Sequence, residues 1–357
     1  MKRIIENHRI MSRIVVLLLT LGLVIPGVVP VVAAEAYGAP RVKVSINSSG
    51  GIGTMPLRDK TLNDSGVDGV NSGLAKDATF KAPDKAKKSG PRREPARGNA
   101  PAVYLNGENG DDSNDGTTKE TAVKTFSKAK ELAENLALGN DNVIVYVTGT
   151  VSVSGAETWK FSSPDKITMY REPDFKGNLV KVKTTGNLTL KDIIIDGNKD
   201  NANADKTDGD SSLIYLNGEL RKGGTLSILT GASLQNNKLT RITGDLYHPP
   251  GRGGAVFAFS GSTVNLNGGT ISGNTAVWGG GIFAMQATVN MKDGIITGNA
   301  AVNSKSKYHP ASGGGIDTDY RSTINISGGV ISKNTSEGNG GAFHWALQQR
   351  VQDPTLN

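Results

Sequence analysis

Acidic side chains that could carry acid–base chemistry stand close together near the end of the chain. Asp317 and Asp319 alternate along a short strand-like run, which places them on one strand face, and Arg321 follows two residues later. In this arrangement they could act as acid, base and charge-stabilising cation in polysaccharide cleavage. A solvated sheet face explains the same pattern, because the repeated segments nearby carry no matching acids. These three residues are the catalytic candidates.

A second group of candidates would bind a ligand without transforming it. Tyr-His-Pro occurs twice in polar insertions, with Tyr247 and His248 in the first and Tyr308 and His309 in the second. Aromatic rings on neighbouring loops can form a shallow patch for a sugar or a partner. Alternatively, each tyrosine packs back onto its own scaffold. Equivalent outward positions on the strands that follow would extend the patch with exposed side chains: Phe257, Phe283 and His344. An alternation shifted by one residue would instead bury Phe257 and Phe283.

Two acidic segments could hold calcium, and no other cofactor is expected. Asp111 and Asp115 alternate as the oxygen donors of a calcium loop do, but Ala122 stands where such a loop carries a bidentate glutamate. An Asx-rich turn before a helix is the alternative. The other segment has no regular ligand spacing and also fits a solvated acidic insertion. Its candidates are Asp205, Asp208 and Asp210.

The elements that must position these residues form an internal repeat. Asn237, Asn274, Asn299 and Asn334 recur at intervals of 37, 25 and 35 residues, and a glycine pair and a short apolar strand follow each. Such a period predicts stacked units that bury a shared apolar face. The polar–apolar alternation of segments such as TVNLNGGTISGN predicts strands, with glycine corners between them. We therefore expect an all-β parallel β-helix, a solenoid in which the asparagines stack as a buried ladder.

The repeats resemble those of a known group of proteins. The glycine-pair strand followed by G-[GT]-x-I-[ST]-x-N is similar to the repeats of right-handed parallel β-helix surface proteins. These belong to the pectin-lyase-like superfamily, in particular to its adhesin-like and polymorphic outer-membrane-protein-like members. The segment AVYLNGENGDDSNDGTTKETAVKTFSKAKELA resembles the opening strand, loop and capping helix of such domains. The resemblance covers about residues 101–346 and implies a fold more than an activity, because this superfold hosts lyases, hydrolases, adhesins and phage spikes.

The chain divides into four parts. Residues 1–36 have the basic start, apolar stretch and small-residue exit of an export signal, with an uncleaved membrane anchor as the alternative. Residues 37–100 predict a disordered basic linker. Residues 101–346 form the β-helix, capped by a helix over about 125–138, and 347–357 form an irregular tail that predicts a truncated chain. Earlier, less regular strands are expected at Val143–Val147, Val151–Val153, Ile167–Met169, Leu188–Leu190, Ile193–Ile195 and Leu213–Leu216.

Charge and composition narrow the class of function. The net charge is +7, but residues 101–357 hold 24 Lys and Arg against 25 Asp and Glu, so the positive charge belongs to the first 100 residues. Such a stretch, poor in aromatic residues, favours contact with anionic cell-wall polymers over nucleic-acid binding. The absence of cysteine excludes a disulfide framework and thiol catalysis.

Together these patterns predict a secreted or cell-surface β-helix protein that does not contact the membrane after its signal is cleaved. It would act as an adhesin-like scaffold that binds a polysaccharide or a host-surface glycoconjugate. The alternative is a polysaccharide lyase or glycoside hydrolase of the same fold. Aromatic residues and variable loops favour binding, whereas acids with Lys or Arg across three adjacent repeats would favour an enzyme.

Overall fold

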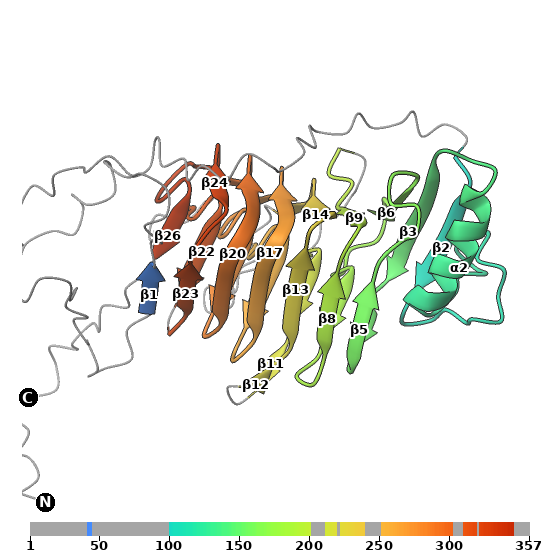
Figure 1. The fold of residues 1–357 in the computed structure, drawn as a ribbon, viewed down its shortest axis with the longest axis horizontal. Coiled ribbons are helices and arrows are strands. Elements are labelled where there is room, and N and C mark those ends of the chain that lie inside the picture. The colour runs from blue at the N-terminus through green and yellow to red at the C-terminus, as the bar shows by residue number, and fades with distance from the viewer. Residues whose placement is uncertain are drawn as a thin grey trace, which may run out of the picture. The chain divides into compact units, whose positions relative to one another are not determined.

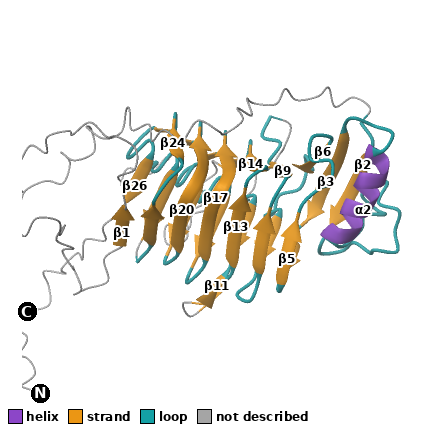
Figure 2. Ribbon diagram, in the orientation of Figure 1, coloured by secondary structure: helices purple, strands orange, loops and turns teal. Residues whose placement is uncertain are grey.

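Parallel β-sheets make up most of the part of the chain that the structure describes. The computed structural model describes residues 41–44, 100–200, 211–219, 222–239, 251–302, 310–319 and 321–345. All of them belong to one compact unit, Gly38–Asn357. Figure 2 shows that strands dominate, with one helix among the described residues. The expectation of an all-β protein is confirmed for this part of the chain.

The largest sheet has thirteen strands. Its main path runs, in spatial order, through β1 (Arg41–Val44), β23 (Thr323–Ile326), β20 (Thr288–Thr297), β17 (Thr263–Ser272), β14 (Ala232–Gln235), β9 (Ile193–Asp196), β6 (Ile167–Arg171), β3 (Val143–Gly149) and β2 (Ala102–Asn106). Its remaining strands pair off this path: β5 (Ala156–Trp159), β8 (Asn187–Leu190), β13 (Thr225–Leu229) and β24 (Val330–Ser332).

Two further parallel sheets and one hairpin complete the strands. The seven-stranded sheet contains, in spatial order, β4 (Val151–Val153), β7 (Val180–Val182), β10 (Ile214–Leu216), β16 (Val256–Phe259), β19 (Ile282–Met285), β22 (Ile316–Asp319) and β26 (Phe343–Trp345). The four-stranded sheet contains β15 (Lys238–Leu239), β18 (Thr275–Ala276), β21 (Ala300–Ala301) and β25 (Thr335–Ser336). The antiparallel hairpin is β11 (Gly218–Glu219) with β12 (Lys222–Gly223).

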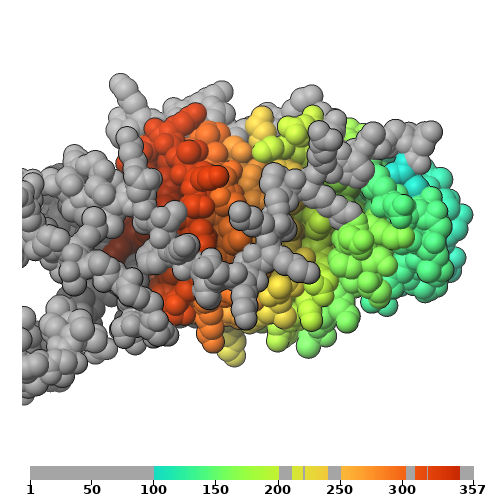
Figure 3. Space-filling view, turned by 45° about the horizontal axis from the view of Figure 1, so that its top comes forward, coloured from blue at the N-terminus to red at the C-terminus, as the bar shows by residue number. Residues whose placement is uncertain are grey.

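The chain visits the three parallel sheets in the same order in successive repeats. Strands β17, β18 and β19 are followed by β20, β21 and β22, and each strand pairs in parallel with its counterpart (Figure 1). Val264 lies beside Val289, and Val289 beside Ile324, so equivalent residues stack. In Figure 3 the later repeats form adjacent bands of colour that end in red. This arrangement is compatible with a β-helix or another solenoid.

The asparagines of the repeat form the buried ladder that the sequence predicts. Asn274 donates from its backbone N and its Nδ2 to the Oδ1 of Asn299, at 3.0 Å each. Asn299 does the same to Asn334, at 2.9 and 3.0 Å. The backbone N of Asn237 donates to Asn274 Oδ1, and the Oδ1 of Asn237 accepts from the buried guanidinium of Arg171. The ladder therefore satisfies polar groups inside an apolar interior, where an unpaired group would be costly.

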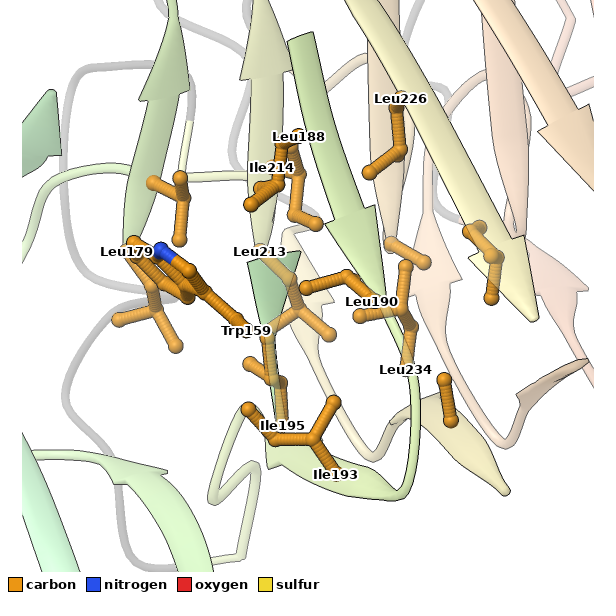
Figure 4. Close-up of a cluster of buried hydrophobic side chains, with 14 of the residues drawn as sticks. Trp159, Leu179, Leu188, Leu190, Ile193, Ile195, Leu213, Ile214, Leu226 and Leu234 are labelled. Atoms are coloured by element: carbon orange, nitrogen blue, oxygen red, sulfur yellow. The ribbon is translucent and has the colours of Figure 1, made fainter. Parts of the chain in front are cut away.

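The core is continuous from the first strands to the last repeat. Figure 4 shows Trp159, Leu188, Ile195 and Leu234 among side chains that point toward one another between the sheets. Along each strand, every second side chain points into this core. The side chains between them point away from it, and many of these are polar.

The predicted helix is present as α2, Phe126–Ala137, with Thr125 as its N-cap. The hydroxyl of Thr125 accepts a hydrogen bond from the backbone N of Lys128, at 3.2 Å. Asp112 holds the same turn, because its carboxylate accepts from the backbone N of Lys124 and of Thr125. One apolar face of α2 is buried, and its Phe126 ring stacks on Trp159 with centroids 4.4 Å apart. The helix is thus anchored to the first strands.

The early strands expected from the sequence are also present, with small differences at their ends: β3, β4, β6, β8, β9 and β10. The expected export signal and tail lie outside the described residues. The expected linker contains one described strand, β1, which the sequence did not predict. None of the helices described here is long and apolar enough to span a membrane.

Candidate functional site

The outer face of the seven-stranded sheet carries one continuous row of side chains. Val256 and Ala258 of β16 face the main core, so the residues between and after them face outward. The strand pairings align the outward positions of successive strands in register. We call this set the outer row: Ser152, Lys181, Tyr215, Phe257, Phe283, Asp317 and His344.

Aromatic rings form the middle of the outer row. The centroids of Tyr215 and Phe257 lie 5.2 Å apart, and those of Phe257 and Phe283 lie 5.6 Å apart. Arg252 lies over both phenylalanines, with its guanidinium carbon 6.0 Å from the Phe257 centroid and 5.4 Å from that of Phe283. Such cation–π and edge-to-face contacts hold the rings in fixed orientations.

The two phenylalanines are less accessible than the sequence suggests. Both point away from the main core, as predicted, but they are only 5% and 4% exposed. They pack with Val277 and Trp278 in a second apolar cluster, against which Tyr215, Phe259 and Met285 are half-buried. The expected exposed platform of Phe257 and Phe283 is therefore wrong. The accessible parts of this region belong to the half-buried residues around them.

The outer row ends in a pair of ionisable side chains. Asp317 is 2% exposed, and its Oδ1 lies 2.8 Å from Nδ1 of His344. Its Oδ2 accepts a hydrogen bond from the hydroxyl of Ser312, at 2.6 Å. Burial raises the pKa of the Asp317 carboxyl above its ordinary value, while the contacts with His344 and Ser312 oppose that change. A buried carboxylate with one imidazole partner is thus placed at the end of an aromatic row.

This arrangement can orient an imidazole but does not form a nucleophilic triad. In a serine nucleophile the hydroxyl bonds to the imidazole, whereas Ser312 bonds to the carboxylate instead. Asp317 fixes the ring of His344 through Nδ1, so Nε2 is the nitrogen available for proton transfer. His344 keeps 17% of its side chain exposed. The chemistry that this pair can support is general acid–base catalysis.

The other catalytic candidates lie apart from this pair. Asp319 pairs in register with Met285, half-buried and two residues further along the face from Asp317. Arg321 is exposed in the turn that follows β22, where its φ is 59°. The structure therefore joins Asp317 to a residue of the next repeat and not to its neighbours in sequence. The partner residues that sequence reasoning missed are Ser312, Arg252 and Trp278.

Several sequence candidates lie outside the described residues: Tyr247, His248, Tyr308, His309, Asp205, Asp208 and Asp210.

The other two calcium candidates, Asp111 and Asp115, lie in the described part of the chain. Asp111 accepts from the backbone N and hydroxyl of Ser113, both at 2.8 Å. Asp115 accepts from Thr117 and from the hydroxyl of Thr121, at 2.7 Å for the latter. These carboxylates stabilise turns, as in the Asx alternative. In the described part of the chain, no three His, Asp or Glu side chains gather closely enough to hold a metal.

A cavity of about 650 Å³ lies near the other end of the outer row. It is bounded by the start of α2 and by strands β4 and β5, and Ser152 of the row lies in its wall. Lys124 and Lys130 bring positive charge to the wall, while Glu157 is bonded to the indole nitrogen of Trp159, at 2.8 Å. The outer row thus runs from a cavity with cationic walls to the Asp317–His344 pair.

The burial of Asp317 predicts a pH-dependent stability. Because its folded-state pKa is raised above 3.8, the folded protein holds this proton at a higher pH than the unfolded chain does. The free energy of unfolding should therefore fall as the pH rises from the unfolded-state pKa of Asp317 to its higher folded-state pKa. Asp317→Asn should remove this fall, because asparagine does not titrate. We expect the stability of Asp317→Asn relative to wild type to increase as the pH rises above about 4 in urea titrations. A D317N profile parallel to that of wild type would contradict the assignment.

Comparison with known proteins gives no relative from which a role for these residues could be transferred: no family model, no curated protein and no solved structure matches this chain.

Proposed function

We propose that this chain is a right-handed parallel β-helix of the pectin-lyase-like kind, exported to the cell surface as an adhesin-like scaffold. Its ligand would be a polysaccharide or a host-surface glycoconjugate, bound along the outer face of the seven-stranded sheet. The repeated parallel pairing and the stacked asparagines support the fold. The basic segment before residue 101 would contact anionic wall polymers, and neither nucleic acid nor membrane is a proposed partner.

The observation that carries the binding proposal is the aromatic part of the outer row. Sugar rings present C–H faces that stack on aromatic side chains, and they bind best where those side chains are held rigidly. Tyr215 and Phe259 are half-buried, so each keeps an accessible part while Phe257 packs between them. Lys181 lies over the Tyr215 ring, at 5.8 Å from its centroid, and could bond to acidic or hydroxyl groups of a glycan.

Binding is expected to depend on this face. On a glycan array probed with the full-length protein, Tyr215→Ala should weaken binding about tenfold, the value of one well-placed contact of about 1.4 kcal/mol. The double variant Tyr247→Ala/Tyr308→Ala should also weaken it if the Tyr-His-Pro loops take part. Tyr146→Ala is the matched control, because Tyr146 lies in a similar tyrosine row between Tyr104 and Tyr170, on the thirteen-stranded sheet. Equal losses in Tyr215→Ala and Tyr146→Ala would argue against the proposed face.

The Asp317–His344 pair favours a second candidate function, cleavage of the bound polysaccharide. An imidazole oriented by a buried carboxylate can remove a proton, which is the first step of a lyase reaction. Hydrolysis that uses two flanking carboxylates fits less well, because Asp317 is bonded to His344 and not placed opposite a second acid. If the full-length protein cleaves a polymer, His344→Ala should abolish cleavage while weakening binding on the array less than Tyr215→Ala does. Binding without cleavage in wild type would assign the face to recognition alone.

A further inference from the structure

The last repeat that the structure describes, from β23 to β26, is less covered than those before it. Ile326 and Phe343 are half-buried, whereas Met291 and Ile316, their partners in the preceding repeat, are fully buried. Trp345 at the end of β26 is 39% exposed. Apolar side chains beside the backbone of an edge strand form a site where another strand can pair. This edge therefore needs a cover if the protein is to remain a single chain in solution.

Strand β1 covers part of this edge. It pairs in parallel with β23, with Val42 opposite Ile324 and Val44 opposite Ile326. The sequence Arg-Val-Lys-Val of β1 has the same polar–apolar alternation as Thr-Ile-Asn-Ile of β23 and Thr-Val-Asn-Leu of β17. Strand β1 thus occupies the register position that the first strand of a further repeat would occupy.

A second row of asparagines leads to the same position. On the other side of these strands from the core, Nδ2 of Asn290 donates to Oδ1 of Asn265, and Nδ2 of Asn325 donates to Oδ1 of Asn290, both at 2.8 Å. The row therefore ends in the acceptor Oδ1 of Asn325. The next register position belongs to Lys43, so the backbone of β1 lies where the following strand of this row would lie.

The geometry of the chain allows β1 to come from the same molecule. Nine strands lie on the main path from β2 to β1, so eight spacings of about 4.8 Å place the two edges roughly 38 Å apart. The 55 residues 45–99 could extend to roughly 180 Å. The opposite edge, β2, is already occupied, because Leu105 pairs with Val123 in a parallel bridge and α2 packs nearby.

We propose that Arg41–Val44 is a capping strand that prevents β23 from pairing with a second copy of this protein. When the cap is displaced, the exposed β23 of one copy pairs with the exposed β23 of another. Because both copies use the same edge, this contact is closed and gives a dimer, not a filament. The occupied β2 edge offers no second site for growth. Occupation of one strand position thus decides between a monomer and a dimer.

A cross-link tests whether the cap comes from the same chain. The protein contains no cysteine, so two introduced cysteines are the only thiols in each chain and can form only one disulfide within it. In the full-length chain, Lys43→Cys/Asn325→Cys should give on oxidation a monomeric product whose disulfide appears in a tryptic digest. Lys43→Cys/Asn290→Cys is the control, because its two positions are separated by two strand spacings, about 9.6 Å, beyond disulfide reach. Cross-linking only between chains, or no more cross-linking than in the control, would overturn the proposal.

Displacement of the cap tests its role. In the full-length double variant Val42→Asp/Val44→Asp, the backbone amides of Ile324 and Ile326 should exchange with deuterium about tenfold faster than in wild type, because the amides of Thr323 and Ser327 bond to the preceding repeat instead. The amides of Thr263–Ser272 should keep their rate. The same variant should elute as a dimer at concentrations where wild type is a monomer. Arg41→Ser, which changes a polar position of β1 outside the asparagine row, should behave as wild type. Unchanged exchange would show that β1 does not cap β23, and faster exchange in a persistent monomer would show that the edge does not accept a second copy.

Discussion

Replacing Asn299 with alanine is expected to lower the free energy of unfolding by about 4 kcal/mol. The amide of Asn299 accepts from the backbone N and from Nδ2 of Asn274, and its own Nδ2 donates to the carbonyl of Ile271, each at 3.0 Å. Alanine removes these three bonds and the bond from Nδ2 of Asn299 to Oδ1 of Asn334, in an interior that water does not reach, because Asn299 is fully buried. Each unpaired buried group costs about 1–3 kcal/mol, so the total is large even when the structure relaxes.

The second asparagine row provides the matched control. Asn290 also bonds to equivalent amides in the repeats before and after it, at 2.8 Å each. It is half-buried, so water can replace the bonds that Asn290→Ala removes, and the expected loss is about 1 kcal/mol or less. Urea unfolding followed by tryptophan fluorescence measures both. Repeat proteins can unfold in parts, so deuterium exchange over 271–299 should accompany it. Similar losses in the two variants would contradict the distinction between the rows.

The ladder also explains an unusual buried cation. Arg171 is fully buried, and burial lowers its pKa to about 9. Its guanidinium donates to the carbonyls of Gly177 and Ser211, and to Oδ1 of Asn237 at 3.3 Å. Each later ladder amide accepts from the asparagine before it, whereas Asn237 accepts from this arginine. Arg171 therefore begins the ladder by supplying the donor that a preceding asparagine would supply.

The repeat pattern predicted the parts of the fold that depend on periodicity alone. The equivalent place in each repeat put Asn274, Asn299 and Asn334 in one buried line, and alternation assigned Val264 and Leu266 to the core; the structure confirms both. The helix at Phe126–Ala137 followed from its apolar spacing, which predicted it over about 125–138. These features are local or recur in every repeat, so the sequence contains them directly.

Features that depend on contacts between different parts of the chain were not predictable. Phe257 faces outward as its position implies, but its burial is decided by Arg252 and Trp278, which lie at the corners and not in the alternating strand. The alternation placed Asp317 and His344 on one face of the sheet, but it does not show which acidic side chain the imidazole of His344 contacts. Strand β1 pairs with β23 across a separation of about 280 residues, and four residues carry too little pattern to predict that contact.

The glycine pair in each repeat sets the distance between repeats, and Gly280→Ala is expected to show this with a loss of about 3 kcal/mol. A Cβ at Gly280 would lie 2.5 Å from the carbonyl oxygens of both Ala300 and Gly314. Both carbonyl oxygens belong to the backbone of neighbouring segments and take part in the pairing between repeats. Neither can move away from the new Cβ without breaking hydrogen bonds. The equivalent residues in the other three repeats are also glycine: Gly254, Gly314 and Gly341.

The position that follows the glycine pair offers a control. A Cβ at Gly281 meets one close oxygen, that of Gly315 at 2.5 Å, and the chain itself carries alanine at the equivalent positions Ala255 and Ala342. A single contact of this kind is evidently relieved by a small shift of the backbone, so Gly281→Ala should cost about 1 kcal/mol or less. Thermal unfolding and deuterium exchange over residues 275–319 compare the two variants. A Gly281→Ala protein as unstable as Gly280→Ala would mean that backbone freedom, and not the closeness of two neighbouring carbonyls, explains why glycine is needed at Gly280.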